Sequence, residues 1–148
     1  MSKLTYIKQR ISQMDGGEFQ EFCDAYLSKL GYKNIHSLGI KSGTHKTTKG
    51  IPDTYFTEVD GKYILVMYTT QVTGDVFEKI TNDINDCFNE SKTGLKNTDI
   101  SEIVYCHTSS NIGAGDDKKL HTLCEDKGVL FNIYGIDRIA QEIYAKYH

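Results

Sequence analysis

The chain has 148 residues, enough for one domain with a single hydrophobic core. Apolar residues make up 39% and charged residues 25%, as in ordinary globular domains, and no apolar run approaches the roughly 18 residues of a membrane span. The net charge of −3 excludes a protein that binds nucleic acid through its overall charge, so any such binding requires a local basic patch. The amino terminus lacks the apolar segment of a signal peptide.

The four cysteines are widely spaced in the sequence and form no Cys-x-x-Cys pair: Cys23, Cys87, Cys106 and Cys124. Three of them fall in segments with periodic apolar residues, which favours reduced thiols in a core over disulfides or zinc ligands. Reduced cysteines are typical of the cytosol, so we expect a cytoplasmic protein with no membrane partner.

The apolar spacing predicts a short leading helix over residues 3–13 and a longer helix over 16–30. Asp15 is expected to cap the second helix, with Glu18 completing a capping box. Gly31 follows where a left-handed residue commonly ends a helix.

Strands and helices then alternate, with a polar, glycine-rich loop over residues 39–50 after the first strand. The predicted strands cover 32–38, 51–58, 62–71, 100–106 and 129–134, and the helices 75–91, 115–127 and 136–147. From the helix over 16–30 the order is αβββαβαβα, in which the second and third strands form a central antiparallel hairpin. Because the later strands are joined by crossover helices, we expect an α/β fold with a mixed sheet flanked by helices.

Two registers of the hairpin are possible. A two-residue loop, Asp60-Gly61, would put Asp53 opposite Tyr68, whereas a three-residue loop with left-handed Gly61 would put it opposite Met67. We predict the second register. Opposed residues share a face of the sheet, so Asp53 and Met67 would then point the same way.

Thr69 and Gln71 share the predicted face of Asp53 and end an otherwise apolar strand, which indicates contact with water or a ligand. A carboxylate beside polar groups on neighbouring strands is typical of a divalent-metal site. Plainer roles remain open, since Asp53 after Pro52 can cap a turn and Met67 can fill the core.

These residues resemble the PD-(D/E)XK nuclease superfamily, whose motif is Pro-Asp, a turn and a strand with a second acidic residue. The helix over 16–30 resembles the first helix of its Mrr-like branch. The chain is most similar to nuclease-like domains at the amino terminus of larger bacterial defence proteins with NTPase modules. Those domains share Lys-Thr-x-Lys-Gly-x-Pro-Asp-x-Tyr, matched by residues 46–55, and a strand ending Glu-Tyr-Thr-Thr-Gln, matched by residues 67–71 except at Met67.

The resemblance implies a restriction-endonuclease-like fold and a role for each matching position. Asp53 would bind Mg²⁺ or Mn²⁺, Met67 takes the place of the second acidic ligand, and Thr69 takes the place of the superfamily lysine. Gln71 would line the same face, and Gln20 lies near a helix position that is often glutamate. These five residues form the expected catalytic site.

The implied function is that of a metal-dependent DNA endonuclease, the effector of a defence system. Magnesium prefers oxygen ligands and a thioether is a poor substitute, so Met67 is expected to impair hydrolysis. Lys46 and Lys49 would contact the DNA backbone. The alternative is a non-catalytic module of the same fold that binds nucleic acid or protein.

The resemblance also implies an organisation. Residues 1–148 would form a single nuclease-like domain of a longer polypeptide that carries NTPase or sensor modules. Cutting both strands of DNA usually requires two such domains, so we expect a homo-oligomer.

Overall fold

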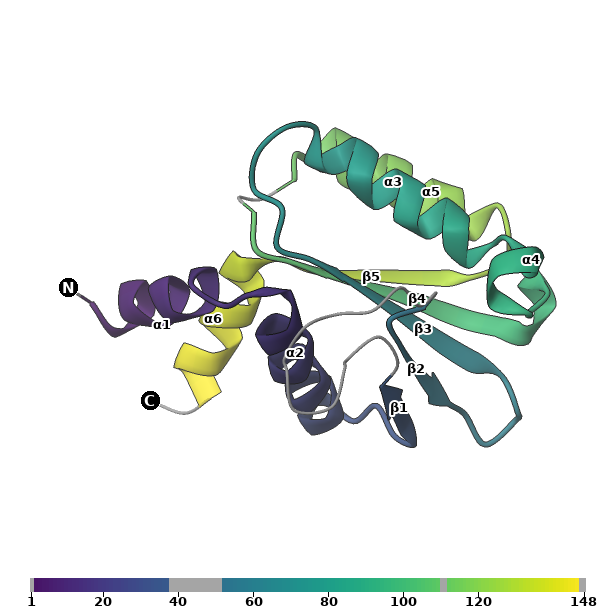
Figure 1. The fold of residues 1–148 in the computed structure, drawn as a ribbon, viewed down its shortest axis with the longest axis horizontal. Coiled ribbons are helices and arrows are strands. Elements are labelled where there is room, and N and C mark those ends of the chain that lie inside the picture. The colour runs from purple at the N-terminus through teal and green to yellow at the C-terminus, as the bar shows by residue number, and fades with distance from the viewer. Residues whose placement is uncertain (1, 38–51, 110–111, 147–148) are drawn as a thin grey trace.

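The computed structural model describes residues 2–37, 52–109 and 112–146 (Figure 1). Its elements in chain order are α1 (Lys3–Ser12), α2 (Gly16–Leu30), β1 (Ile35–Ser37), β2 (Thr54–Thr57), β3 (Tyr63–Thr69), α3 (Val76–Cys87), α4 (Glu90–Thr93), the 3-10 turn η1 (Asn97–Asp99), β4 (Ile100–His107), α5 (Ala114–Glu125), β5 (Leu130–Tyr134) and α6 (Ile136–Lys146).

Within the described residues the strands form one mixed sheet in the order β1-β2-β3-β4-β5. The pairs β1–β2 and β2–β3 are antiparallel, whereas β3–β4 and β4–β5 are parallel. This arrangement confirms the predicted α/β class, the antiparallel hairpin and the crossover helices. The carboxyl ends of β3, β4 and β5 therefore meet the amino end of β2 at one edge of the sheet.

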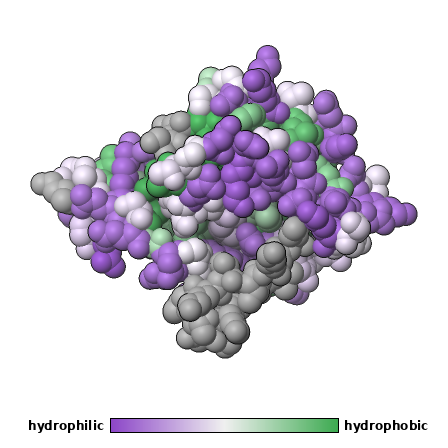
Figure 2. All heavy atoms as spheres, turned by 45° about the horizontal axis from the view of Figure 1, so that its top comes forward, coloured by the Kyte–Doolittle hydropathy of each residue, from purple (hydrophilic) through white to green (hydrophobic). Residues whose placement is uncertain are grey.

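Helices cover both faces of the sheet (Figure 1). One core cluster joins α1, α2 and α6 to the sheet and contains Ile64 and Val66 of β3. The other joins α3 and α5 to the opposite face and contains Leu65 and Met67. The apolar stripes of α3 and α5 face inward, and hydrophilic side chains cover most of their outer side (Figure 2). As predicted for a central strand, β3 is buried on both faces.

Local signals in the sequence correctly located the ends of α2. The Asp15 carboxylate accepts the backbone N–H of Glu18 at 2.8 Å, and the Glu18 carboxylate accepts that of Asp15 at 3.2 Å. Gly31 follows the helix with φ 114°, a left-handed conformation that suits glycine.

The predicted helix over 75–91 is wrong at its end. The structure ends α3 at Cys87 and starts the short α4 at Glu90. Asn89 is the cause, because its side-chain oxygen accepts the backbone N–H of Ser91 at 3.0 Å and caps a new turn. The predicted strands over 32–38, 51–58 and 62–71 are shorter in the structure.

All four cysteines are buried and free, which confirms their predicted place in the core. Cys23 of α2 and Cys106 of β4 are neighbours despite their separation in sequence, and burial, with a hydrogen bond to Cys106, raises the pKa of Cys23 well above its ordinary value. In the part of the chain that the structure describes, no helix is long and apolar enough to cross a membrane.

Candidate functional site

The loop between β2 and β3 has the predicted three-residue form. The backbone N–H of Glu58 donates to the carbonyl of Lys62 at 2.9 Å, and Gly61 is left-handed with φ 86°. Thr54 pairs with Val66 in this register. Continued by one residue, the register places Asp53 opposite Met67, as predicted.

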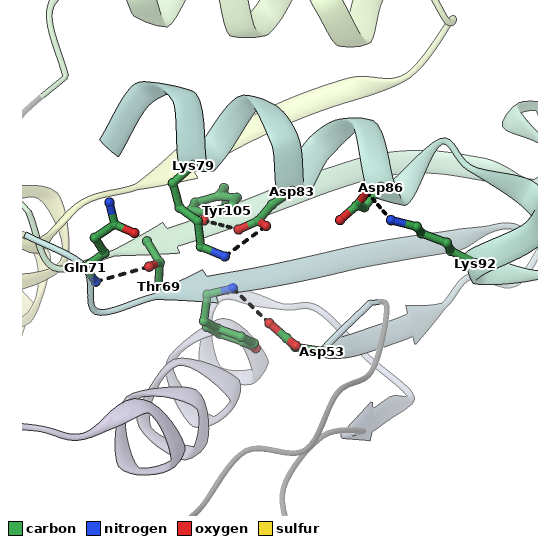
Figure 3. A network of polar contacts seen from close by, with 9 residues as sticks. Asp53, Thr69, Gln71, Lys79, Asp83, Asp86, Lys92 and Tyr105 are labelled. Carbon is green, nitrogen blue, oxygen red and sulfur yellow. Dashed lines mark hydrogen bonds and ion pairs between the residues drawn. The ribbon is translucent and has the colours of Figure 1, made fainter. Parts of the chain in front are cut away.

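Asp53 lies immediately before β2 and is held from two elements. Its Oδ2 accepts the backbone N–H of Tyr68 in β3 at 3.2 Å (Figure 3). Its carbonyl oxygen accepts the side-chain amide of Gln20 in α2 at 3.0 Å, and the same amide donates to Thr54 Oγ1 at 3.2 Å. Gln20 therefore lies beside the predicted site and fixes the backbone of Asp53.

The surroundings of Asp53 disfavour its charge. The pKa of its carboxyl is raised to about 6, chiefly by burial; the nearby carboxylates of Asp83 and Asp24 also raise it, whereas the Tyr68 N–H and the Lys79 ammonium lower it. The negative charge that Asp53 carries at neutral pH is therefore only partly offset by the Tyr68 N–H and the Lys79 ammonium. A carboxylic acid with a shifted pKa, located where parallel strands have their C-terminal ends, is typical of a functional site.

A second aspartate, Asp83 of α3, acts on Asp53, because its charge raises the pKa of that carboxyl. Its side chain is only 8% exposed. The hydroxyl of Tyr105 donates to Asp83 Oδ2 at 2.6 Å, and the Lys79 ammonium donates to Oδ1 at 3.1 Å, one turn earlier on the helix (Figure 3). Both carboxylate oxygens are therefore engaged.

A third aspartate, Asp24 of α2, has an equivalent arrangement on the opposite face. Its carboxylate accepts the hydroxyl of Tyr68 and that of Thr54, the latter at 3.0 Å. A buried aspartate bonded to a tyrosine hydroxyl thus lies on each face of β3 and β4, and both carboxylates act on Asp53.

Sequence reasoning missed Asp24, Lys79 and Asp83. A signal for the two aspartates was present, because each interrupts the apolar stripe of its helix. Asp83 lies three residues after Ile80 and four before Cys87, both of them buried. Charged residues are almost never buried without a partner, so such a position implies one.

The other predicted residues of β3 are less open to a ligand than expected. Met67 is 6% exposed and packs in the core cluster with Ile80 and Ile84. Thr69 Oγ1 accepts the backbone N–H of Gln71 at 3.1 Å, and the Gln71 amide donates to the carbonyl of Thr73 at 2.9 Å. Both polar side chains therefore stabilise the turn that leads into α3. Lys46 and Lys49 lie outside the described residues.

His107 ends β4 at the same edge, beside Thr69. It is buried, and its Nδ1 lies 2.9 Å from Ser109 Oγ. Burial lowers the pKa of His107 to about 4, so the imidazole is neutral at physiological pH. The ring packs against Gly135, where an added Cβ would come 2.8 Å from Cε1. This close packing indicates a structural role.

In the described parts of the chain, no three His, Cys, Asp or Glu side chains are grouped so that they could hold a metal ion. Asp53 is the predicted carboxylate ligand, whereas both carboxylate oxygens of Asp83 are already engaged by Tyr105 and Lys79. Magnesium commonly uses one or two carboxylates and completes its shell with water and substrate phosphate. Asp53 supplies one oxygen ligand for such a cation, but Met67 supplies none, so the residues present fit a hard cation only in part.

A scan of protein-family models finds none that matches this sequence, and a search of curated proteins finds no significant match.

Proposed function

We propose that this chain is a restriction-endonuclease-like nuclease domain, a metal-dependent DNA endonuclease that serves as the effector of a bacterial defence protein. The observation that carries the proposal is Asp53, a partly buried carboxylate with a raised pKa at the edge where β2 and β3 meet. The sheet supports it, because an antiparallel hairpin followed by parallel strands agrees with the element order of that fold.

The residues have separate tasks in this proposal. Asp53 would hold Mg²⁺ or Mn²⁺ through its carboxylate, and Gln20 and the Tyr68 N–H would keep that carboxylate in place. When bound, the ion supplies Lewis-acid polarisation of the phosphate and a water of lowered pKa. Lys46 and Lys49 would contact the DNA backbone, which is a salt-sensitive and sequence-independent interaction.

Met67 limits this activity. The position opposite Asp53 is filled by a thioether that packs in the core, and sulfur of this kind is a poor ligand for magnesium. The same observation favours a second candidate, a module of this fold that binds nucleic acid or protein without cleaving. Further modules of the polypeptide and a second copy of the domain would be its partners in either case.

Plasmid cleavage with Mg²⁺ or Mn²⁺ tests the proposal on four proteins: this chain, Met67→Glu, Met67→Gln and Asp53→Asn. Restoring a carboxylate should raise the cleavage rate by about 100-fold over the glutamine control, which matches it in size but not in charge. Asp53→Asn should abolish cleavage in both backgrounds. DNA binding without cleavage by any variant, even after forced dimerisation, would establish the second candidate. If no variant binds or cleaves DNA, the nuclease and a DNA-binding module are both refuted.

A further inference from the structure

We propose that Lys79 contacts a phosphate at this site, in addition to Lys46 and Lys49, and that Asp83 and Tyr105 position it. The inference rests on the proposed function, because it needs a nucleic-acid phosphate beside Asp53. It assigns to a residue of α3 the cationic role that the resemblance places at Thr69 in β3.

The ammonium of Lys79 acts on the charge of Asp53. Among the lysines that the structure describes, Lys79 is the one whose charge lowers the pKa of Asp53. Figure 3 shows its side chain extending from α3 over β3, on the same side of the sheet as Thr69. The ammonium thus lies over the end of β3 and would attract a phosphate bound beside Asp53.

The ammonium is held by an ion pair and is still accessible to a ligand. The side chain of Lys79 is 41% exposed, whereas that of its acceptor Asp83 is 8% exposed. An ammonium has three N–H donors, and the bond to Asp83 Oδ1 uses one of them. The remaining donors can reach phosphate oxygens while the stem stays fixed.

The ion-pair partner of Lys79 is itself fixed from the core. Asp83 is itself fixed by the Tyr105 hydroxyl at 2.6 Å, and Tyr105 is fully buried in β4. A surface ion pair needs no such support. The chain Tyr105–Asp83–Lys79 instead orients one cation from the core of the sheet, and such preorganisation strengthens stabilisation of a developing charge.

Strand β3 itself carries no cationic side chain. Thr69, at the position of the superfamily lysine, has no charge and bonds to the backbone of Gln71. Lys79 is placed to supply from the helix what the strand lacks.

Lys92 provides a matched control. It forms an ion pair with Asp86 at 2.8 Å, and its side chain is 46% exposed, close to the value for Lys79. Lys92 is not among the groups that shift the pKa of Asp53. Lys79→Met and Lys92→Met thus remove the same charge from two lysines of similar exposure, each paired with an aspartate, and only the first should affect the site.

The test measures binding of a short DNA duplex in Ca²⁺ across a range of salt concentrations. It also measures cleavage in Mg²⁺, either in the parent chain or in the Met67→Glu background, whichever cuts. Lys79→Met should reduce the slope of log K against log salt by about 0.9, the value for one lost phosphate contact. It should lower cleavage about 100-fold. Lys92→Met should match its parent, and Lys79→Arg should keep the slope.

Asp83→Asn tests the positioning role. It keeps the charge of Lys79 but weakens its anchor, so the salt slope should persist while kcat falls and KM changes little. A merely structural role would leave kcat unchanged in the protein that remains folded.

The outcomes separate the two proposals. If the parent binds or cuts DNA and Lys79→Met behaves as Lys92→Met does, the role of Lys79 is refuted and the nuclease domain is not. If the parent neither binds nor cuts DNA, both are refuted. If the parent binds without cutting, the salt slope alone decides the role of Lys79.

Discussion

The carboxylate of Asp53 accepts the backbone N–H of Tyr68 at 3.2 Å, one residue beyond the Met67 position that it faces across the hairpin. The bond is to the main chain, so it depends on the register of β2 and β3 rather than on the side chain at 67 or 68. It partly offsets the burial that raises the pKa of Asp53. The protein thus holds in a fixed position a carboxylate whose ionised form destabilises the folded state, as functional sites commonly do.

Asp53→Asn should stabilise the protein above about pH 6. Because the pKa of Asp53 rises from 3.8 to about 6 on folding, the folded state retains a proton that the unfolded state has lost. The wild type therefore loses stability as pH rises from about 4 to about 6. The variant has no such loss, and its amide oxygen can still accept the Tyr68 N–H.

We expect the variant to be more stable than the wild type by about 2 kcal/mol at pH 8 and by almost nothing at pH 4. The figure for pH 8 is lower than the full pKa shift would give, because Asp53 is partly exposed and solvent screens its charge. Urea unfolding at the two pH values measures this. His107 titrates in the same interval but is common to both proteins, so its contribution cancels. A difference that does not change with pH would contradict the prediction.

Met67→Glu should make stability depend on divalent cations. The side chain at this position is 6% exposed, so an added carboxylate loses hydration and should cost about 2–4 kcal/mol without metal. Manganese at about 100 times its Kd should return about 2.7 kcal/mol. Thermal unfolding with and without Mn²⁺ measures the effect, with Met67→Leu as the control. The same response to manganese in both variants would exclude a metal contact at this position.

Tyr105→Phe should destabilise the protein by about 1.5–3 kcal/mol, because it removes a hydroxyl that donates to the buried Asp83 carboxylate at 2.6 Å. Tyr6→Phe is the control, since Tyr6 is 56% exposed and should change stability by less than about 0.5 kcal/mol. Denaturant unfolding of both variants compares them. Equal stabilities would mean that the Tyr105 bond contributes nothing net.

Gly135→Ala should be destabilising by about 1–3 kcal/mol, because the new Cβ would come 2.8 Å from the ring of His107. That ring is buried and held by Ser109, so it has little room to move. In α5, the Cβ added by Gly115→Ala would have no atom within 4 Å, so this substitution should instead stabilise the helix by about 0.5–1 kcal/mol. Differential scanning calorimetry distinguishes the two, and a neutral Gly135→Ala would show that the ring can shift.

Several features of this protein were predictable because short-range interactions control them. The start of α2 depends on Asp15 and Glu18, three residues apart, and its end on Gly31. The loop that sets the hairpin register depends on a left-handed Gly61. The shared face of Asp53 and Met67 follows from that register, since side chains alternate along a strand.

The sequence by itself therefore determined the element order, the hairpin and the location of Asp53. Only the tertiary structure decided what surrounds that carboxylate. Tyr105 and Asp83 are 22 residues apart, and Tyr68 and Asp24 are 44 apart, so neither pair has a signature of its own in the chain. Whether Met67 fills a core, and whether a lysine on α3 reaches Asp53, likewise depends on how helices pack across the sheet. Periodicity shows which side of an element faces inward, but the partner that it meets there is set by long-range packing.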